Sequence, residues 1–187
     1  MVNNELKNKF IELLKSTRRE GIDDLISYIE TTDFYSAPAS TRFHGSKEGG
    51  LLEHSLKVYE IFDKKIKEAG ISFPDDSIKI SALLHDLCKV NFYKVDYRNT
   101  KNSLGEWVKV PYYTINDTLP LGHGEKSVMM IRDYIKLSRE EMFSIRWHMG
   151  FTEPKESYNY VGETFNNYPM ALLLHEADLE ATYLAKI

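Results

Sequence analysis

The chain has 187 residues, of which 42% are hydrophobic and 28% charged, with a formal net charge of −4, as is typical of a globular protein with one core. The acidic balance argues against a dedicated binder of nucleic acid or anionic membranes, although it leaves nucleotide substrates open. One cysteine, an N-terminus without a signal-peptide core and a longest apolar run of only 170–174 favour a cytoplasmic protein with no membrane span and no disulfide partner.

Helical periodicity dominates the first ninety residues, where apolar residues recur at three- and four-residue spacing. A loop rich in breakers follows the second helix over 31–50, and Gly70 ends the third. Asp76 or Ser77 is the expected N-cap of the fourth helix. The four helices are expected over 4–16, 22–30, 51–70 and 76–90.

The character of the chain changes at about 92–118, which is rich in Tyr, Val, Thr and Trp and predicts an inserted β-hairpin or irregular lobe. Helices return over 123–137 and 138–150, the second with a Ser138–Glu141 capping box. A Tyr/Asn-rich loop then leads to a last helix opened by Pro169. These elements predict an all-α helical bundle and a single domain over 1–187, with two N-terminal helices within 1–35.

Five of the expected helices each direct a histidine or an aspartate toward the interior: those with His54, His85, His123, His148 and Asp178. One interior polar group is often satisfied by the core, but five converging groups need a shared partner. Imidazole and carboxylate ligands suit Fe, Mn, Co, Ni or Zn, and the lack of further cysteines excludes a thiolate zinc site. His85 and Asp86 would diverge by about 100° on a helix, so either the metal lies near the helix axis line or Asp86 bridges two metals.

Four short motifs frame these residues: GGLLEHS at 49–55, LLHDLCK at 83–89, GHGEKS at 122–127 and HEADLEA at 175–181. In this order they resemble the HD-domain superfamily of metal-dependent phosphohydrolases, and the two additional histidines resemble its binuclear branch. The resemblance covers about 40–185 and is similar to the HD domain of bacterial 3′–5′ exoribonucleases and to stand-alone bacterial and phage HD proteins. One departure is Cys88, where many members have glycine.

The resemblance implies two divalent transition-metal ions, the first held by His54, His85, Asp86 and Asp178 and the second by His123, His148 and the bridging Asp86. It implies hydrolysis of a phosphomonoester or phosphodiester of a nucleotide, dinucleotide or short oligonucleotide by a metal-bridging hydroxide.

Asp86 and Lys89 are the expected catalytic residues. Lys89 lies within one helical turn of both His85 and Asp86, where its ammonium is placed to stabilise a phosphate or the leaving oxygen. The open alternative is a solvated Asp–Lys helix pair.

Four further side chains are candidates for binding the substrate: Arg42, His44, Arg146 and His175. Each has an ordinary alternative, as a surface residue or, for His175, as a satisfied core histidine or a residue that orients a ligand. Cys88 is expected to be a small buried hydrophobe.

The segment 89–109 carries five cationic and two acidic side chains among aromatic residues. It suits a lid that stacks a base, but also a hairpin that packs on the helices or forms a homodimer contact.

Two other functions stay open. A mixed-valent di-iron oxygenase resembling the inositol and phosphonate oxygenases uses the same six ligands, so the ligands cannot discriminate. A non-catalytic nucleotide-binding module is the third possibility. The complete set of metal-ligating residues argues against it, because HD domains that have lost activity usually lack some of them. Lys89 and the framing motifs favour hydrolysis.

Overall fold

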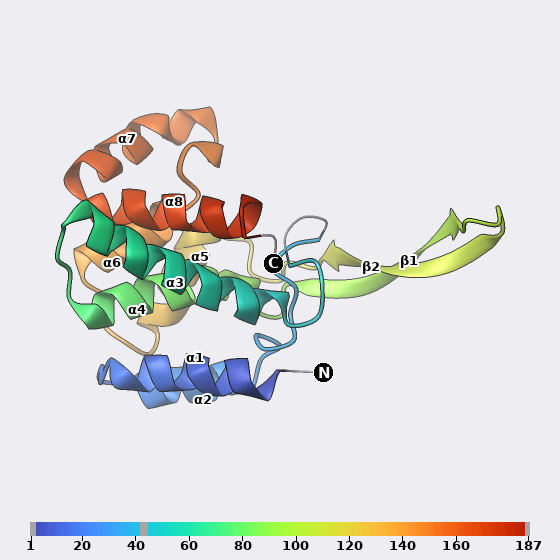
Figure 1. Ribbon diagram of the computed structural model, residues 1–187, viewed down its shortest axis with the longest axis horizontal. Coiled ribbons are helices and arrows are strands. Elements are labelled where there is room, and N and C mark those ends of the chain that lie inside the picture. The colour runs from blue at the N-terminus through green and yellow to red at the C-terminus, as the bar shows by residue number, and fades with distance from the viewer. Residues whose placement is uncertain (1–2, 42–44, 186–187) are drawn as a thin grey trace.

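The structure is a computed structural model that describes residues 3–41 and 45–185. Within these residues the chain forms eight α-helices and one antiparallel β-hairpin (Figure 1), which confirms the predicted all-α fold with an inserted hairpin. The elements are α1 (Asn4–Ser16), α2 (Ile22–Glu30), α3 (Gly50–Ala69), α4 (Asp75–Leu84), β1 (Tyr93–Lys101), β2 (Trp107–Ile115), α5 (His123–Arg132), α6 (Arg139–Trp147), α7 (Tyr158–Asn167) and α8 (Pro169–Tyr183).

Several helix ends lie where local chemistry predicts them. The Ser138 side chain accepts from the Glu141 backbone N–H while Glu141 reaches back to the Ser138 N–H, which is the predicted capping box of α6. Pro169 occupies the first turn of α8, and Gly70 ends α3 in a left-handed conformation at φ 66°.

Three sequence-based expectations about the helices are wrong. The helix expected over 123–137 ends at Arg132. The helix expected over 76–90 begins at Asp75, after Pro74 as N-cap, and ends at Leu84; a short 3₁₀ helix, Leu87–Lys89, follows a turn. The loop expected before Pro169 contains α7, although Tyr and Asn are weak helix formers. Because α7 buries Val161 and Thr164 and packs on α8, tertiary contacts override local propensity there.

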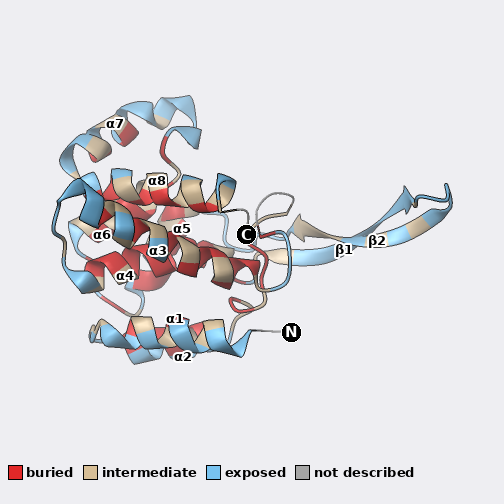
Figure 2. Ribbon diagram, viewed as in Figure 1, coloured by how far each residue is buried: buried red, intermediate tan, exposed pale blue. Residues whose placement is uncertain are grey.

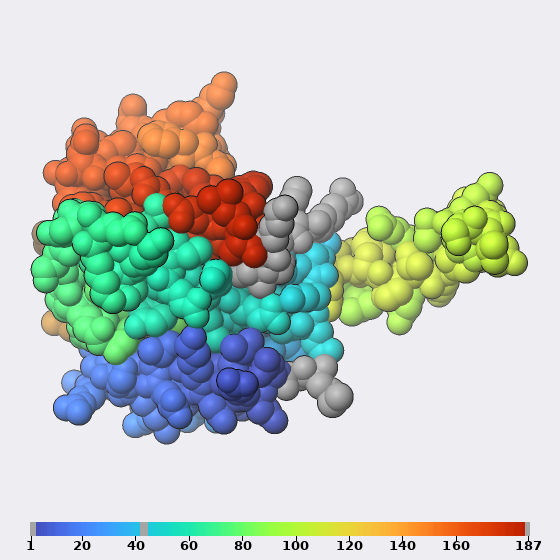
Figure 3. All heavy atoms as spheres, in the orientation of Figure 1, coloured from blue at the N-terminus to red at the C-terminus, as the bar shows by residue number. Residues whose placement is uncertain are grey.

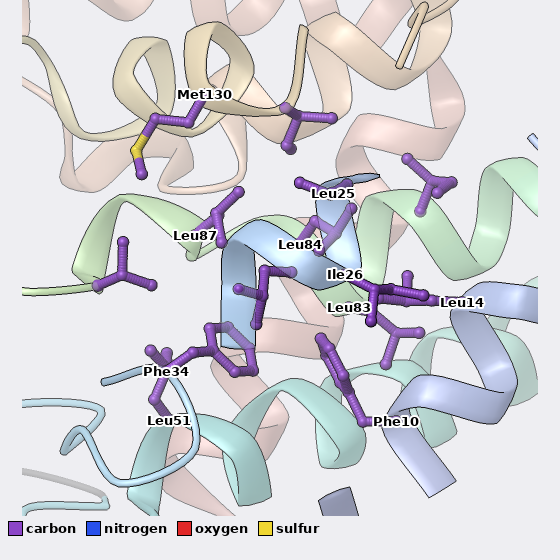
Figure 4. Packing of buried hydrophobic residues seen from close by; sticks show 14 of the residues in the cluster. Phe10, Leu14, Leu25, Ile26, Phe34, Leu51, Leu83, Leu84, Leu87 and Met130 are labelled. Carbon is purple, nitrogen blue, oxygen red and sulfur yellow. The ribbon is translucent and has the colours of Figure 1, made fainter. Parts of the chain in front are cut away.

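The core consists of two adjoining clusters. The larger joins α1 and α2 to α3, α4, α5 and α6 through side chains such as Phe10, Leu25 and Leu84 (Figure 4). The smaller joins α3 and α4 to α8 through side chains such as Phe62 and Leu174. Since α3 and α4 contribute to both clusters, we propose that the N-terminal helices and the rest of the chain fold as one domain.

The hairpin extends away from the helical body (Figures 1 and 3), and most of its residues are exposed (Figure 2). Its strands pair from Tyr93 with Ile115 out to Lys101 with Trp107. Cationic and aromatic side chains contact one another across the strands, as in Lys101 over the Trp107 ring at 5.4 Å. In this arrangement the hairpin neither closes over the body nor packs on the helices within the described residues, in contrast to two of the three expectations for this segment. The third, a homodimer contact, stays a proposal.

Over the described ranges, no helix combines the length and the apolar character needed to cross a bilayer.

Candidate metal centre

Five helices bring six ionisable side chains to one place. His54 lies within α3, His123 is the first residue of α5, and Asp178 lies within α8. The remaining three follow helix ends: His85 and Asp86 after α4, and His148 after α6. All six predicted metal ligands are therefore gathered.

The Asp86 carboxylate lies between two pairs of histidines. Its Oδ2 atom is 3.6 Å from Nε2 of His54 and 3.4 Å from Nε2 of His85. Its Oδ1 atom is 2.8 Å from Nε2 of His123 and 3.6 Å from Nε2 of His148. Asp178 adds a second carboxylate, with Oδ1 3.1 Å from Nε2 of His54. Each Asp86 oxygen thus faces a different histidine pair, as a bridging carboxylate requires.

Backbone carbonyls orient two of the rings. Nδ1 of His85 lies 2.8 Å from the Ala82 carbonyl oxygen and Nδ1 of His148 lies 2.7 Å from that of Ile145, so each Nδ1–H donates and leaves Nε2 as a lone-pair donor. Both Nε2 atoms are buried and make no hydrogen bond within the described part of the chain. Buried imidazole nitrogens of this kind, facing carboxylate oxygens, fit a divalent metal.

A close approach of α5 and α6 brings His123 next to His148. A Cβ atom on Gly124 would lie 2.2 Å from the carbonyl oxygen of Arg146, so only glycine allows these backbones to come so near. The two imidazole ring centres are consequently 5.1 Å apart.

Three overlapping groups of residues each offer candidate ligand atoms that lie within 4.8 Å of one another inside the group. The groups are His54, His85 and Asp86; His85, His148 and Asp178; and Asp86, His123 and His148. Their overlap fits either one ion or two.

The protonation states also suit a metal. Burial alone would raise the pKa of the Asp86 carboxyl, but the charge of Lys89 and a hydrogen bond from His123 hold that pKa well below its usual range. The pKa of Asp178 is likewise lowered, because a hydrogen bond with His54 outweighs the effect of burial. Burial lowers the pKa of His123, which favours the neutral ring. Charged carboxylates and a neutral imidazole are the forms that bind metal.

Lys89 lies at the wall of a cavity of about 130 Å³ that borders Asp86 and Asp178. Its Nζ is 2.6 Å from Oδ2 of Asp86. The Asp–Lys pair considered as the alternative is therefore present, but it is largely buried, and Lys89 also faces the cavity.

The other candidate substrate residues differ in their placement. His175 lines the same cavity, and its Nδ1 lies 2.6 Å from the carbonyl oxygen of His148, which fits a residue that holds a ligand-bearing segment. Arg146 instead pairs with Glu125 and Glu153 and lines a pocket that shares no residue with the six ligands. Arg42 and His44 lie outside the described residues.

Cys88 contacts one of the candidate ligands, His123. Its Sγ is 3.2 Å from Nδ1 of His123, and burial raises the pKa of its thiol to about 12. The expectation of a small buried side chain is met, with this contact in addition.

Lys126 was missed by the sequence reasoning, although its buried side chain lies near the centre. Its position three residues after His123, on the same helix face, was the available signal.

Five helices bring four histidines and two aspartates together. This arrangement defines a helical metal-binding protein. The HD domain family model matches residues 51–186, well over half of the chain, and the chain therefore belongs to the HD domain family. HD domains bind divalent metals, and the gathered histidines and aspartates are groups able to hold them.

The chain is also similar to a curated protein, the dihydroneopterin 2′,3′-cyclic phosphate phosphodiesterase of Methanocaldococcus jannaschii, with 38% identity over 91 residues. That match covers 46% of this chain and 34% of the relative, so the chain spans about a third of the relative's length. No solved structure matches the chain significantly.

Proposed function

We propose that this protein is a metal-dependent phosphohydrolase that cleaves a phosphodiester or phosphomonoester of a nucleotide, dinucleotide or short oligonucleotide. The observation that carries the proposal is the Asp86 carboxylate, whose two oxygens face two different pairs of histidines. Membership of the HD domain family and similarity to a phosphodiesterase support the same reaction class. The relative's name adds 2′,3′-cyclic phosphates to the substrates worth testing.

The proposed centre holds two divalent ions from the set Fe, Mn, Co, Ni and Zn. One would be bound by His54, His85, Asp86 and Asp178, and the other by Asp86, His123 and His148. When bound, such ions activate water for attack and stabilise negative charge on a phosphoryl group.

The protein's own groups supply positioning and charge. The carbonyls of Ala82 and Ile145 fix the rings of His85 and His148, so that Nε2 of each points inward. Lys89 presents a largely buried ammonium at the wall of the cavity, where it can donate to a phosphate oxygen or to the leaving oxygen. His175 donates to the carbonyl of His148 and so holds the end of α6 in place.

The test compares the wild type with Asp86→Asn, which keeps the size of the side chain but removes its charge. We expect the variant to lose bound metal and at least about 1,000-fold in hydrolysis of bis(p-nitrophenyl) phosphate, because both proposed ions share this carboxylate. Metal content is measured by mass spectrometry. Asp133→Asn, an exposed aspartate, is the matched control. Hydrolysis by Asp86→Asn at the wild-type rate would refute the assignment.

The other two functions are outcomes of the same test. Iron-dependent oxygen consumption on a polyol or a phosphonate, without phosphate-ester hydrolysis, would identify a di-iron oxygenase. Nucleotide binding without turnover of any ester would identify a binding module.

A further inference from the structure

A second cavity, of about 100 Å³, lies beside the metal centre on the side of His123. Its wall includes Lys89 and Lys126, so two lysines and a candidate metal ligand face one small space. Lys89 also lines the larger cavity, so its side chain borders both cavities.

Lys126 is 4% exposed, which is unusual for a lysine. Its Nζ lies 4.9 Å from the centre of the Phe92 ring and 2.5 Å from Oδ1 of Asp117. Because α5 begins at His123, the positive end of the helix dipole lies at the same cavity. Three sources of positive potential, two lysines and a helix end, therefore meet there.

The present partner of Lys126 is at the edge of this cavity. The Asp117 side chain is 28% exposed, whereas that of Lys126 is 6% exposed. Lys89, the second cation, faces Asp86, a proposed metal ligand. When metal ions bind Asp86, they offset its negative charge. The two lysines then outweigh Asp117, and the cavity favours an anion.

We propose that this second cavity is an anion subsite for a phosphate other than the one that is cleaved, so that the protein selects bisphosphorylated nucleosides or 5′-phosphorylated nucleotides. The proposal deepens the proposed function and rests on it for the identity of the cleaved phosphate. Lys126 donates to the second phosphate, and Asp117 competes with that phosphate for the ammonium.

A purely structural alternative makes Lys126 and Asp117 a contact that fastens the segment between β2 and α5. Two variants separate the readings. Lys126→Met removes the cation, and Asp117→Asn removes the competing charge but keeps the lysine. If Lys126 and Asp117 form only a structural contact, both variants break it and should change binding of the second phosphate in the same direction. If the cavity is a subsite, Lys126→Met should weaken binding of that phosphate and Asp117→Asn should strengthen it. Lys136→Met, an exposed lysine, is the matched control.

The experiment uses the full chain loaded with Mn²⁺ and compares adenosine 3′,5′-bisphosphate with adenosine 3′-phosphate by titration calorimetry. We expect the wild type to bind the bisphosphate about tenfold tighter, as one charge-assisted hydrogen bond allows. Lys126→Met should bring this ratio of Kd values close to one, and Asp117→Asn should raise it about threefold or more. Lys136→Met should leave the ratio unchanged.

The subsite is refuted if the wild type shows no bisphosphate preference, if Lys126→Met keeps the ratio, or if Asp117→Asn lowers it as Lys126→Met does. Hydrolysis of bis(p-nitrophenyl) phosphate by the same preparations keeps the two proposals apart. Hydrolysis without a bisphosphate preference refutes the subsite alone, and the preference without any hydrolysis refutes the proposed function alone.

Discussion

Asp86 lies between the histidines because α4 ends just before it. In a continuous helix the side chains of His85 and Asp86 would point about 100° apart. The backbone leaves the helical conformation at Asp86, with φ −103° and ψ 20°, and its Oδ2 lies 3.4 Å from Nε2 of His85. A substitution that extended α4 through Asp86 would therefore separate two proposed ligands without changing either side chain.

Lys89 carries a prediction at the same scale. We expect Lys89→Met to retain its metal and to lose about 100-fold in kcat on phosphate esters, because a buried donor at the cavity wall stabilises developing charge. Metal content and steady-state kinetics are measured together. Lys94→Met makes the same change of charge on the exposed hairpin and should leave both unchanged.

Two results would contradict this role for Lys89. An unchanged kcat would mean that the lysine only balances the charge of Asp86. A loss of metal together with rate would mean that it supports the ligands and does not act on the substrate.

At the scale of elements, the sequence predicts those features of helices that depend on residues close together along the chain. The capping box of Ser138 and the first-turn Pro169 are local signals, and the inward faces of α3 and α8 follow from helical periodicity. That is why the histidines and aspartates could be recognised as one set. Their gathering was therefore predictable, although their roles as ligands stay a proposal.

What the sequence could not show depends on contacts between distant segments. The end of α4 and the helix α7 arise from packing that no local pattern encodes, and the position of Lys126 one turn after His123 does not by itself show that this lysine is buried. The Lys126 ammonium lies against Phe92, which precedes the hairpin, and Asp117, which follows it. Arg146 is the opposite case, because the sequence suggested that it binds substrate. In the structure it forms ion pairs with two glutamates, away from the six proposed ligands.

Arg19 joins elements that are far apart in the sequence. It follows α1, and its Nε lies 2.5 Å from Oδ2 of Asp76 in α4. Its guanidinium also pairs with Glu141, a fully buried residue of α6, and donates to the carbonyl of Lys136 at 3.0 Å. The N-terminal helices are thus joined to α4 and α6 by charge as well as by apolar packing.

This network predicts a pH dependence of stability. Burial acts to raise the pKa of Asp76, but the hydrogen bond and charge of Arg19 outweigh it and lower that pKa. A lowered pKa in the folded state means that the stabilisation is complete above the unfolded pKa, near 3.9, and is lost as the pH falls through the folded pKa. We expect Asp76→Asn to reduce the free energy of unfolding by about 1 kcal/mol at pH 7.

Urea unfolding between pH 7 and pH 3 measures the difference between Asp76→Asn and the wild type, which should shrink in acid. Asp23→Asn, an exposed aspartate in the first turn of α2, is the control and should not show this convergence. A difference that stays constant down to pH 3 would show that the pair with Arg19 contributes no pH-dependent stability.

At the scale of the whole molecule, the hairpin stands apart from the body that holds the centre. Neither hydrophobic cluster of buried residues includes a residue of β1 or β2, and Val95, Tyr97 and Trp107 are more than half exposed. Phe92 and Asp117, which flank the hairpin, line the second cavity. We therefore expect the core to form without the hairpin, and its apolar and cationic surface keeps a homodimer contact open as a proposal.

Shortening the hairpin tests this separation. Lys94 pairs with Thr114, so replacing residues 95–113 by Asn-Gly closes the strands with a two-residue turn at their base. We expect the unfolding temperature to change by less than about 4 °C, which corresponds to about 1 kcal/mol for a chain of this size. Metal content and hydrolysis of bis(p-nitrophenyl) phosphate should stay within about threefold of the wild type, since no proposed ligand is removed. A loss of hydrolysis with the metal retained would instead restore the hairpin as a lid, and a dimer that becomes a monomer in light scattering would identify it as the contact between two copies.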